Sequence, residues 1–330
     1  MNEENSLISI LTQFLTLPPD GSGALALLSA YAAERDSLRT DALGSVIWER
    51  AGEGEPILLE AHLDTIAMVA TAVLPEGFLR VQPVGGVDRR MLPASAVTVW
   101  GREKLCGVVA SVPPHLKDKN APEVPEWPDM LVDLIGADER TSLVSPGDFI
   151  SMDAPPQTLQ NGTITAAGLD NRAGCATVLW ALLLTRKCPH CVTAVFAVRE
   201  ETNGAGALTA AYTARAQSAI AVDVSFAQSP NVTPEEGGKL GGGAMLGISP
   251  VLDIAVTERL RRLAEREDIP LQPEVMGSRT GTDADKIQTV RAGIPTGLLS
   301  IPLRSMHTAA EIIALSDIEN AAKLLAAAIK

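Results

Sequence analysis

The sequence is short of aromatic residues, basic residues and long apolar runs. Aromatic side chains make up only 3% of its 330 residues, so it offers few flat rings for stacking against sugars or bases. Lysine and arginine total 27 against 40 acidic residues, and this net charge of -13 argues against a protein that binds nucleic-acid phosphates. No apolar run reaches the roughly 18 residues that span a bilayer. We therefore expect neither a nucleic acid nor a membrane as a partner.

Cysteine is also scarce, with four residues in the whole chain. Four scattered thiols are too few for a disulfide framework in a protein of this length. Residues 1–5 are polar and acidic, whereas a secretory signal needs a basic start followed by an apolar stretch. These features predict a reduced, cytoplasmic protein. Cys188 and Cys191 have the spacing of a redox dithiol, but they separate a predicted helix from a predicted strand, so we expect a structural turn there.

The content of hydrophobic residues, 46%, and of charged residues, 20%, is close to globular averages, and the length suggests two domains. Before residue 69 the apolar pattern predicts helices within 6–35 and strands at 45–48 and 57–61. After residue 160 it predicts helices at 171–187, 205–215, 252–268, 283–292 and 316–329, and strands at 192–198, 220–224 and 297–301. Strands that alternate with helices indicate an α/β fold, with a mixed, largely parallel sheet and helices on both of its faces.

The segment 69–160 has a different character. Eleven of the 22 prolines lie in it, and short β-rich pieces such as 96–100 and 106–109 alternate with turns. So many prolines disfavour long helices. We therefore expect residues 1–68 and 161–330 to form one α/β domain, with a small, β-barrel-like domain at 69–160 inserted in it.

Seven histidines and acids lie at the ends of predicted strands or at the start of a following helix, where ligands of α/β sheets gather. They are His62, Asp64, Asp170, Glu200, Glu201, Asp223 and His307. Imidazole and carboxylate groups suit divalent zinc, manganese or cobalt. Two such ions need one histidine each, one shared carboxylate and one terminal carboxylate each, and the set supplies these with two acids left over. A pair of ions activates water for attack on an amide or phosphate ester, and a spare acid can act as the general base.

Each of these residues also has an ordinary structural interpretation. A single acid at a strand end is usually a helix cap or a solvated charge. The adjacent pair Glu200 and Glu201 is more informative, because like charges directly after a buried strand cost free energy unless a cation lies nearby. Spacing alone leaves both interpretations open.

Six local motifs in the same order resemble one known family over nearly the whole chain. They are EAHLD at 60–64, GLDNRAG at 168–174, VREE at 198–201, AVDV at 221–224, GTDA at 281–284 and IPLRSMH at 301–307. Together they resemble the glutamyl aminopeptidase family, also known as tetrahedral aminopeptidases and including proteins labelled "cellulase M". The resemblance implies a dinuclear metallo-aminopeptidase fold of the zinc-aminopeptidase type, whose inserted β-barrel-like domain serves in dimerisation.

The resemblance also implies a role for each candidate residue. His62 and Asp223 would hold one metal ion, Glu201 and His307 the other, and Asp170 would bridge the two. Glu200 would be the general base. Asp64 would hold His62 in its ligating tautomer. Thr282, Asp283 and Arg304 lie in the last two motifs and are the candidates for binding the substrate.

The sequence departs from the usual family motifs at a few positions. Thr65 stands where glutamate is common, Asn171 where a second aspartate is frequent, and Thr308 where serine is usual. The residues after Glu201 are Thr202 and Asn203 rather than a Val-Gly pair. None of these changes removes an expected ligand, and they concern the shape of the substrate pocket.

The resulting prediction is a cytoplasmic aminopeptidase that removes N-terminal residues from peptides. Two divalent ions per subunit are expected, with zinc first and cobalt or manganese as alternatives. The resemblance further implies dimers joined into a hollow tetrahedral dodecamer. Two alternatives stay open: a two-metal deacylase or carboxypeptidase, and a non-catalytic assembly protein of the same fold. A glycosidase fits poorly, because it needs two acids across a sugar and aromatic platforms are scarce.

Overall fold

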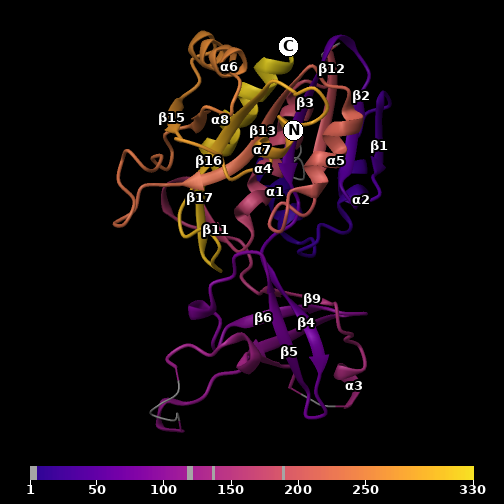
Figure 1. Ribbon diagram of the computed structural model, residues 1–330, viewed down its shortest axis with the longest axis vertical. Coiled ribbons are helices and arrows are strands. Elements are labelled where there is room, and N and C mark those ends of the chain that lie inside the picture. The colour runs from indigo at the N-terminus through magenta and orange to yellow at the C-terminus, as the bar shows by residue number, and fades with distance from the viewer. Residues whose placement is uncertain (1–5, 117–121, 136–137, 188–189) are drawn as a thin grey trace.

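Figure 1 shows the computed structural model of the chain, which describes residues 6–116, 122–135, 138–187 and 190–330. A large body of helices around a sheet lies above a smaller β-barrel. The chain leaves the large body after β3 (Glu53–His62), builds the barrel, and returns before α4 (Leu169–Leu184). This arrangement confirms the predicted fold class, an α/β protein with a mixed, largely parallel sheet and an inserted barrel.

The sheet of the large body has eight strands within the described residues. From edge to edge they are β1 (Asp36–Thr40), β2 (Val46–Arg50), β12 (His190–Ala197), β3, β13 (Ser218–Phe226), β16 (Thr296–Leu303), β14 (Ala244–Ile248) and β15 (Leu271–Val275). The central strands β12, β3, β13 and β16 run parallel, whereas β2 and β14 join them in antiparallel pairs. Parallel central strands are buried on both faces, which explains their continuous apolar runs.

Helices cover both faces of this sheet. One face carries α1 (Leu7–Leu15), α4, α6 (Ile254–Arg266) and α8 (Leu315–Ile329), whose apolar side chains share one core with the strands. The opposite face carries α5 (Ala205–Ala214) and the short α7 (Ala284–Ile287), which form a smaller core. α2 (Ala24–Ser29) lies beside the edge strand β1. α4 is buried over most of its length, as expected for a helix that is apolar all round.

Six antiparallel strands close the barrel. Around it they are β4 (Ala67–Val73), β5 (Phe78–Val84), β8 (Leu131–Asp133), β7 (Lys104–Val109), β6 (Ala96–Trp100) and β9 (Phe149–Met152). Short helical segments lie in its loops: η2 (Arg89–Met91), η3 (Pro114–Leu116), η4 (Trp127–Asp129) and α3 (Asp138–Thr141). Inward side chains such as Leu79, Val97 and Val132 form a core that is separate from the two cores of the large body.

A small third sheet packs against α4, α8 and β16 of the large body. It contains β10 (Gln157–Thr158), β11 (Thr163–Ala166) and β17 (Glu311–Ala314), with the turn η5 (Gln160–Gly162) between the first two. The register sets Glu311 opposite Ala166, three residues before α4 begins. This pairing brings an acid from near the end of the chain to the start of α4.

Several elements differ from the predicted pattern. The helix expected at 283–292 ends at Ile287, after which Thr289 and Val290 make i→i−3 turn bonds. The positive φ angles of Arg291 and Gly293, 57° and 101°, exclude a right-handed helix as far as 292. The predicted pattern also lacks the edge strands β1 and β15. Both are partly exposed, and their mixed residues give a weak apolar pattern.

The turn predicted at 188–191 lies partly outside the described residues, which include His190 and Cys191 but not positions 188 and 189. Across the described ranges, every helix is too short or too polar to cross a bilayer.

Candidate metal centre

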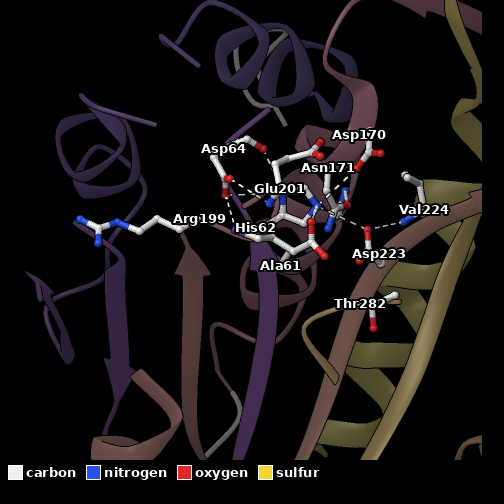
Figure 2. A network of polar contacts seen from close by, with 12 residues as sticks. Ala61, His62, Asp64, Asp170, Asn171, Arg199, Glu201, Asp223, Val224 and Thr282 are labelled. Atoms are coloured by element: carbon white, nitrogen blue, oxygen red, sulfur yellow. Dashed lines mark hydrogen bonds and ion pairs between the residues drawn. The ribbon is translucent and has the colours of Figure 1, made fainter. Parts of the chain in front are cut away.

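The seven predicted residues meet at the carboxyl edge of the central strands. His62 ends β3, Asp223 lies in β13, and Asp170 lies in the first turn of α4. Glu200 and Glu201 follow β12, and His307 follows β16. Figure 2 shows His62, Asp170, Glu201 and Asp223 lying close to one another at this edge. The strands of a parallel sheet end together, so the order β12-β3-β13-β16 brings these side chains to one place.

A first group consists of His62, Asp170 and Asp223. The Nε2 atom of His62 lies 3.3 Å from Oδ1 of Asp170 and 3.6 Å from Oδ1 of Asp223. One ligand atom from each residue lies within 4.8 Å of the others, which is a suitable spacing for one metal ion. All three residues are buried.

A second group consists of Asp170, Glu201 and His307. The Nε2 atom of His307 lies 3.3 Å from Oδ2 of Asp170 and 3.5 Å from Oε2 of Glu201. The ligand atoms of this group also lie within 4.8 Å of one another. Asp170 therefore turns one oxygen toward each group, which is the position that a bridging carboxylate occupies.

The turn after β12 places two adjacent glutamates at the centre. Its first residue, Arg199, has a φ angle of 71°, and its carbonyl accepts hydrogen bonds from the amides of Asn203 and Gly204. The backbone therefore turns over residues 199–204, around the two glutamates. Glu200 lies with Oε2 at 3.9 Å from Nε2 of His62, but it belongs to neither metal group.

Asp64 contacts its neighbours with both its side chain and its main chain. Its carboxylate accepts the backbone N–H of Glu200 at 3.1 Å and of Glu201 at 3.2 Å. His62 Nδ1 lies 2.9 Å from the main-chain oxygen of Asp64 and 3.8 Å from its carboxylate. The tautomer of His62 is thus set by a carbonyl, while the Asp64 side chain fixes the backbone of the two glutamates.

The charges of the centre shift the pKa values of its members in opposite directions. Burial, with nearby carboxylates, raises the pKa of Glu200 to about 8 and that of Glu201 to about 7. Burial also opposes the ionisation of Asp170, but its contacts with His307 and His62 outweigh this and lower its pKa to about 2. The contact with Asp170 in turn raises the pKa of His307 to about 9. Glu200, Glu201 and His307 therefore hold their protons more tightly than usual, and a divalent cation bound here could displace these protons.

Two further acids belong to the centre and are absent from the predicted set. The buried Glu311 accepts the backbone N–H of Asp170 at 3.2 Å and of His307 at 2.9 Å, so it fixes the main chain of two candidate ligands. Glu311 begins a short strand, so a search for acids at strand ends does not find it. The buried Glu60 lies two residues before His62 on the same face of β3, a position that strand alternation could have revealed.

The three candidate substrate residues lie in different surroundings. The Thr282 hydroxyl lies 2.9 Å from that of Thr280 and accepts the amide of Ala284 at 3.2 Å. Asp283 is buried, and burial raises its pKa to about 7. Arg304 is exposed and donates from Nε to the carbonyl of Gln228 at 2.6 Å. It lines a separate cavity of about 510 Å³ with Leu240 and Ile312.

The residues fit a divalent metal pair by their donor chemistry and by an unsatisfied atom. Among the described residues, the buried Oε1 of Glu201 has no hydrogen-bond partner. Two imidazoles and a cluster of carboxylates are the donors that zinc and similar ions prefer. No lysine or arginine of the described residues forms an ion pair with these carboxylates, so a cation is the natural source of neutralising charge.

Known proteins match the chain over most of its length. The sequence model of the M42 glutamyl aminopeptidase family matches residues 44–324. A lysyl aminopeptidase of Pyrococcus furiosus is 31% identical over 296 residues, which cover 88% of this chain and 85% of that protein.

Solved structures give the same result for the fold. An aminopeptidase from the archaeon Desulfurococcus kamchatkensis matches with a TM-score of 0.90 and 30% identity, covering 98% of this chain and 94% of that one. A TET1 peptidase of Pyrococcus horikoshii, which can assemble into a tetrahedron or a large octahedral shell, matches with a TM-score of 0.86 and 29% identity. That match covers 98% of this chain and 99% of the other.

Proposed function

The chain belongs to the M42 glutamyl aminopeptidase family and is a metal-dependent aminopeptidase, and we propose that it binds two divalent ions at the two residue groups joined by Asp170. In this proposal His62 and Asp223 hold one ion, Glu201 and His307 hold the other, and Asp170 bridges them. The observation that carries the proposal is that each Asp170 oxygen lies 3.3 Å from Nε2 of a different histidine.

Glu200, Asp64 and Glu311 hold no ion in this proposal, and each has a task in peptide hydrolysis. Ions bound there supply Lewis-acid polarisation of the scissile carbonyl and acidify water. Glu200 stands inside the centre without belonging to a metal group, and it takes the proton of the attacking water and delivers it to the leaving amine. Asp64 holds the backbone of Glu200 and Glu201, and Glu311 holds that of Asp170 and His307.

The donor set supports zinc as the native metal, with cobalt or manganese as substitutes.

Peptides with a free amino terminus are the substrates of the proposed enzyme, and Thr282, Asp283 and Arg304 remain the proposed substrate residues. We propose the cytoplasm as its compartment, because the chain has few cysteines.

We also propose that the chain associates with itself, first into dimers and then into a dodecamer. The barrel, which we propose as a separate domain near 69–160, would form the dimer contact. The support is the assembly of the similar TET1 peptidase and the separate core of the barrel.

Removal of the metal tests the proposed centre. A chelator should abolish hydrolysis of aminoacyl chromogenic substrates, and zinc, cobalt or manganese should restore it, with two equivalents bound per subunit by elemental analysis. Peptides with a blocked amino terminus serve as the control, because a deacylase or carboxypeptidase would still cleave them. Full activity in protein shown to be metal-free would refute the proposal.

A further inference from the structure

The turn that follows barrel strand β5 lies against the candidate metal centre. Its central residues are Gly85 and Gly86, directly after Val84. A β-carbon on Gly85 would lie 3.2 Å from both Cβ and Oε2 of Glu201, and one on Gly86 would lie 2.9 Å from Nδ1 of His307. Contacts this short are tighter than those of nearly all real β-carbons, so a methyl group on either glycine would force its neighbour to move. The inserted barrel therefore touches two members of the second group directly.

The two histidines of the centre are held in different ways. A ligating histidine usually donates its second ring N–H to a nearby acceptor, and His62 Nδ1 has such a partner in the carbonyl of Asp64. For His307, no acceptor in the described part of the chain lies at hydrogen-bond distance from Nδ1. Its main chain is fixed by Glu311, but the free side of its ring faces the backbone of Gly86. The contacts of Nε2 with Asp170 and Glu201 restrain one side of the His307 ring, and packing on this turn restrains the Nδ1 side.

We propose that the 84–87 turn of the barrel forms one side of the metal centre. There Gly86 positions the His307 ring and Gly85 positions the Glu201 carboxylate. This inference rests on the proposed metal ligands. Neither His62 nor Asp223 is among the described atoms nearest to a β-carbon on Gly85 or Gly86, so the contacts of this turn with the centre are with the second group. The insert would then contribute to metal binding as well as to association between subunits.

Gly86 allows a clean test, since its φ angle is not positive and its backbone accepts an L-residue. In Gly86→Ala the only change is a methyl group beside Nδ1 of His307. We expect the affinity for the equivalent of Zn²⁺ bound by the second group, called the second equivalent below, to fall by about 10- to 100-fold, the usual cost of disturbing a residue that orients a metal ligand. The first equivalent should bind as in the parent. Calorimetric titration of metal-depleted, full-length protein with Zn²⁺ measures both.

Gly277→Ala is the matched control, because its φ angle is also not positive and no atom of the described chain lies within 4 Å of the new β-carbon. It should leave both affinities unchanged. His307→Ala separates this inference from the proposed function. If His307→Ala keeps both equivalents, the ligand assignment itself is wrong. If His307→Ala loses the second equivalent and Gly86→Ala binds it like the parent, the 84–87 turn does not position His307.

A measurement on the unaltered protein covers the case in which Gly86→Ala does not fold. Hydrogen–deuterium exchange of the 84–87 turn should slow when Zn²⁺ is added to metal-depleted protein, because ordered ligands order the turn against them. The turn at 74–77, at the opposite end of β5, should exchange at the same rate in both states. Equal exchange at 84–87 with and without Zn²⁺ would overturn the inference.

Discussion

Two adjacent glutamates have different surroundings at the metal centre, and this difference leads to a prediction. Glu201 belongs to a candidate metal group, whereas Glu200 lies beside His62 and belongs to none. Glu200→Gln keeps the size and polarity of the side chain but cannot accept a proton. Turnover should fall by roughly 10²- to 10⁴-fold, which is the usual contribution of a general base, while the metal content stays at the parent level. Steady-state kinetics and elemental analysis of the same preparation provide both values.

The matched variant is Glu201→Gln, which should lose metal from the second group and lose activity for that reason. Reversed results, with metal lost from Glu200→Gln and kept in Glu201→Gln, would mean that base and ligand are exchanged. Normal turnover in a fully loaded Glu200→Gln enzyme would contradict the mechanism.

Single residues of the centre could be identified from sequence where they end a strand. His62, Glu200, Glu201 and His307 follow this rule, and the structure brings them together with Asp170 and Asp223. The atoms that make the contacts could not be predicted: Asp64 uses its carbonyl toward His62 and its carboxylate toward two backbone amides. Glu311 was out of reach because a long-range strand pairing, β17 with β11, brings it to α4.

At the scale of elements, a buried ion pair joins β1 to β2, and its arginine also bonds to α4. Arg50 donates from Nε and Nη2 to the carboxylate of Asp36 at 2.7 Å and 3.1 Å, and from Nη1 to the carbonyl of Leu182 in α4. Both side chains are inaccessible to solvent. Loss of Asp36 leaves a buried, unpaired guanidinium, so Asp36→Ala should lower the free energy of unfolding by about 3–5 kcal/mol.

Denaturant unfolding measures this loss, and Glu49→Ala is the control from the same hairpin. Its partner Arg39 lies 3.9 Å away and both are exposed, so the change should be at most about 1 kcal/mol. Burial works against the charge of Asp36, but hydrogen bonds from Arg50 and Ala33 outweigh it and lower its pKa. The ionised carboxylate therefore stabilises the fold above its ordinary pKa, and the difference between parent and Asp36→Ala should shrink as the pH falls below that value. Equal losses in the two variants would contradict this account.

Elements were predictable where an apolar period was strong. The buried strands β3, β12 and β13 have continuous apolar runs, and α6 shows an amphipathic pattern capped by Asp253. β1 and β15 lie at the edges of the sheet, where half of the side chains face solvent, so their pattern is too weak to identify. The positive φ angles at Arg291 and Gly293 exclude the predicted extension of this helix to 292, and of the two only the glycine is a sequence signal.

At the scale of the whole molecule, the barrel and the large body have separate cores but one shared site. The change in proline content indicated the insertion from sequence alone, whereas closure of six strands into a barrel depends on long-range pairing, such as β4 with β9. The contact of Gly85 and Gly86 with the centre also joins residues that are more than 100 positions apart in sequence.

The separate cores make removal of the barrel a direct test of the proposed subunit contact. Ile66 and Asp153 flank the antiparallel pair of β4 and β9, in which Met68 lies opposite Ile150, so a short Gly-Ser linker can join them when residues 67–152 are deleted. The remaining sheet keeps both of its own cores and should stay folded, which circular dichroism checks. Because the proposed dimer contact and the 84–87 turn are lost together, the truncated protein should sediment with fewer subunits than the parent. It should also bind the first equivalent of Zn²⁺ normally and the second more weakly. A folded, truncated protein that keeps the parent's subunit count would show that the large body makes the assembly contacts, and the barrel would then have no role in association.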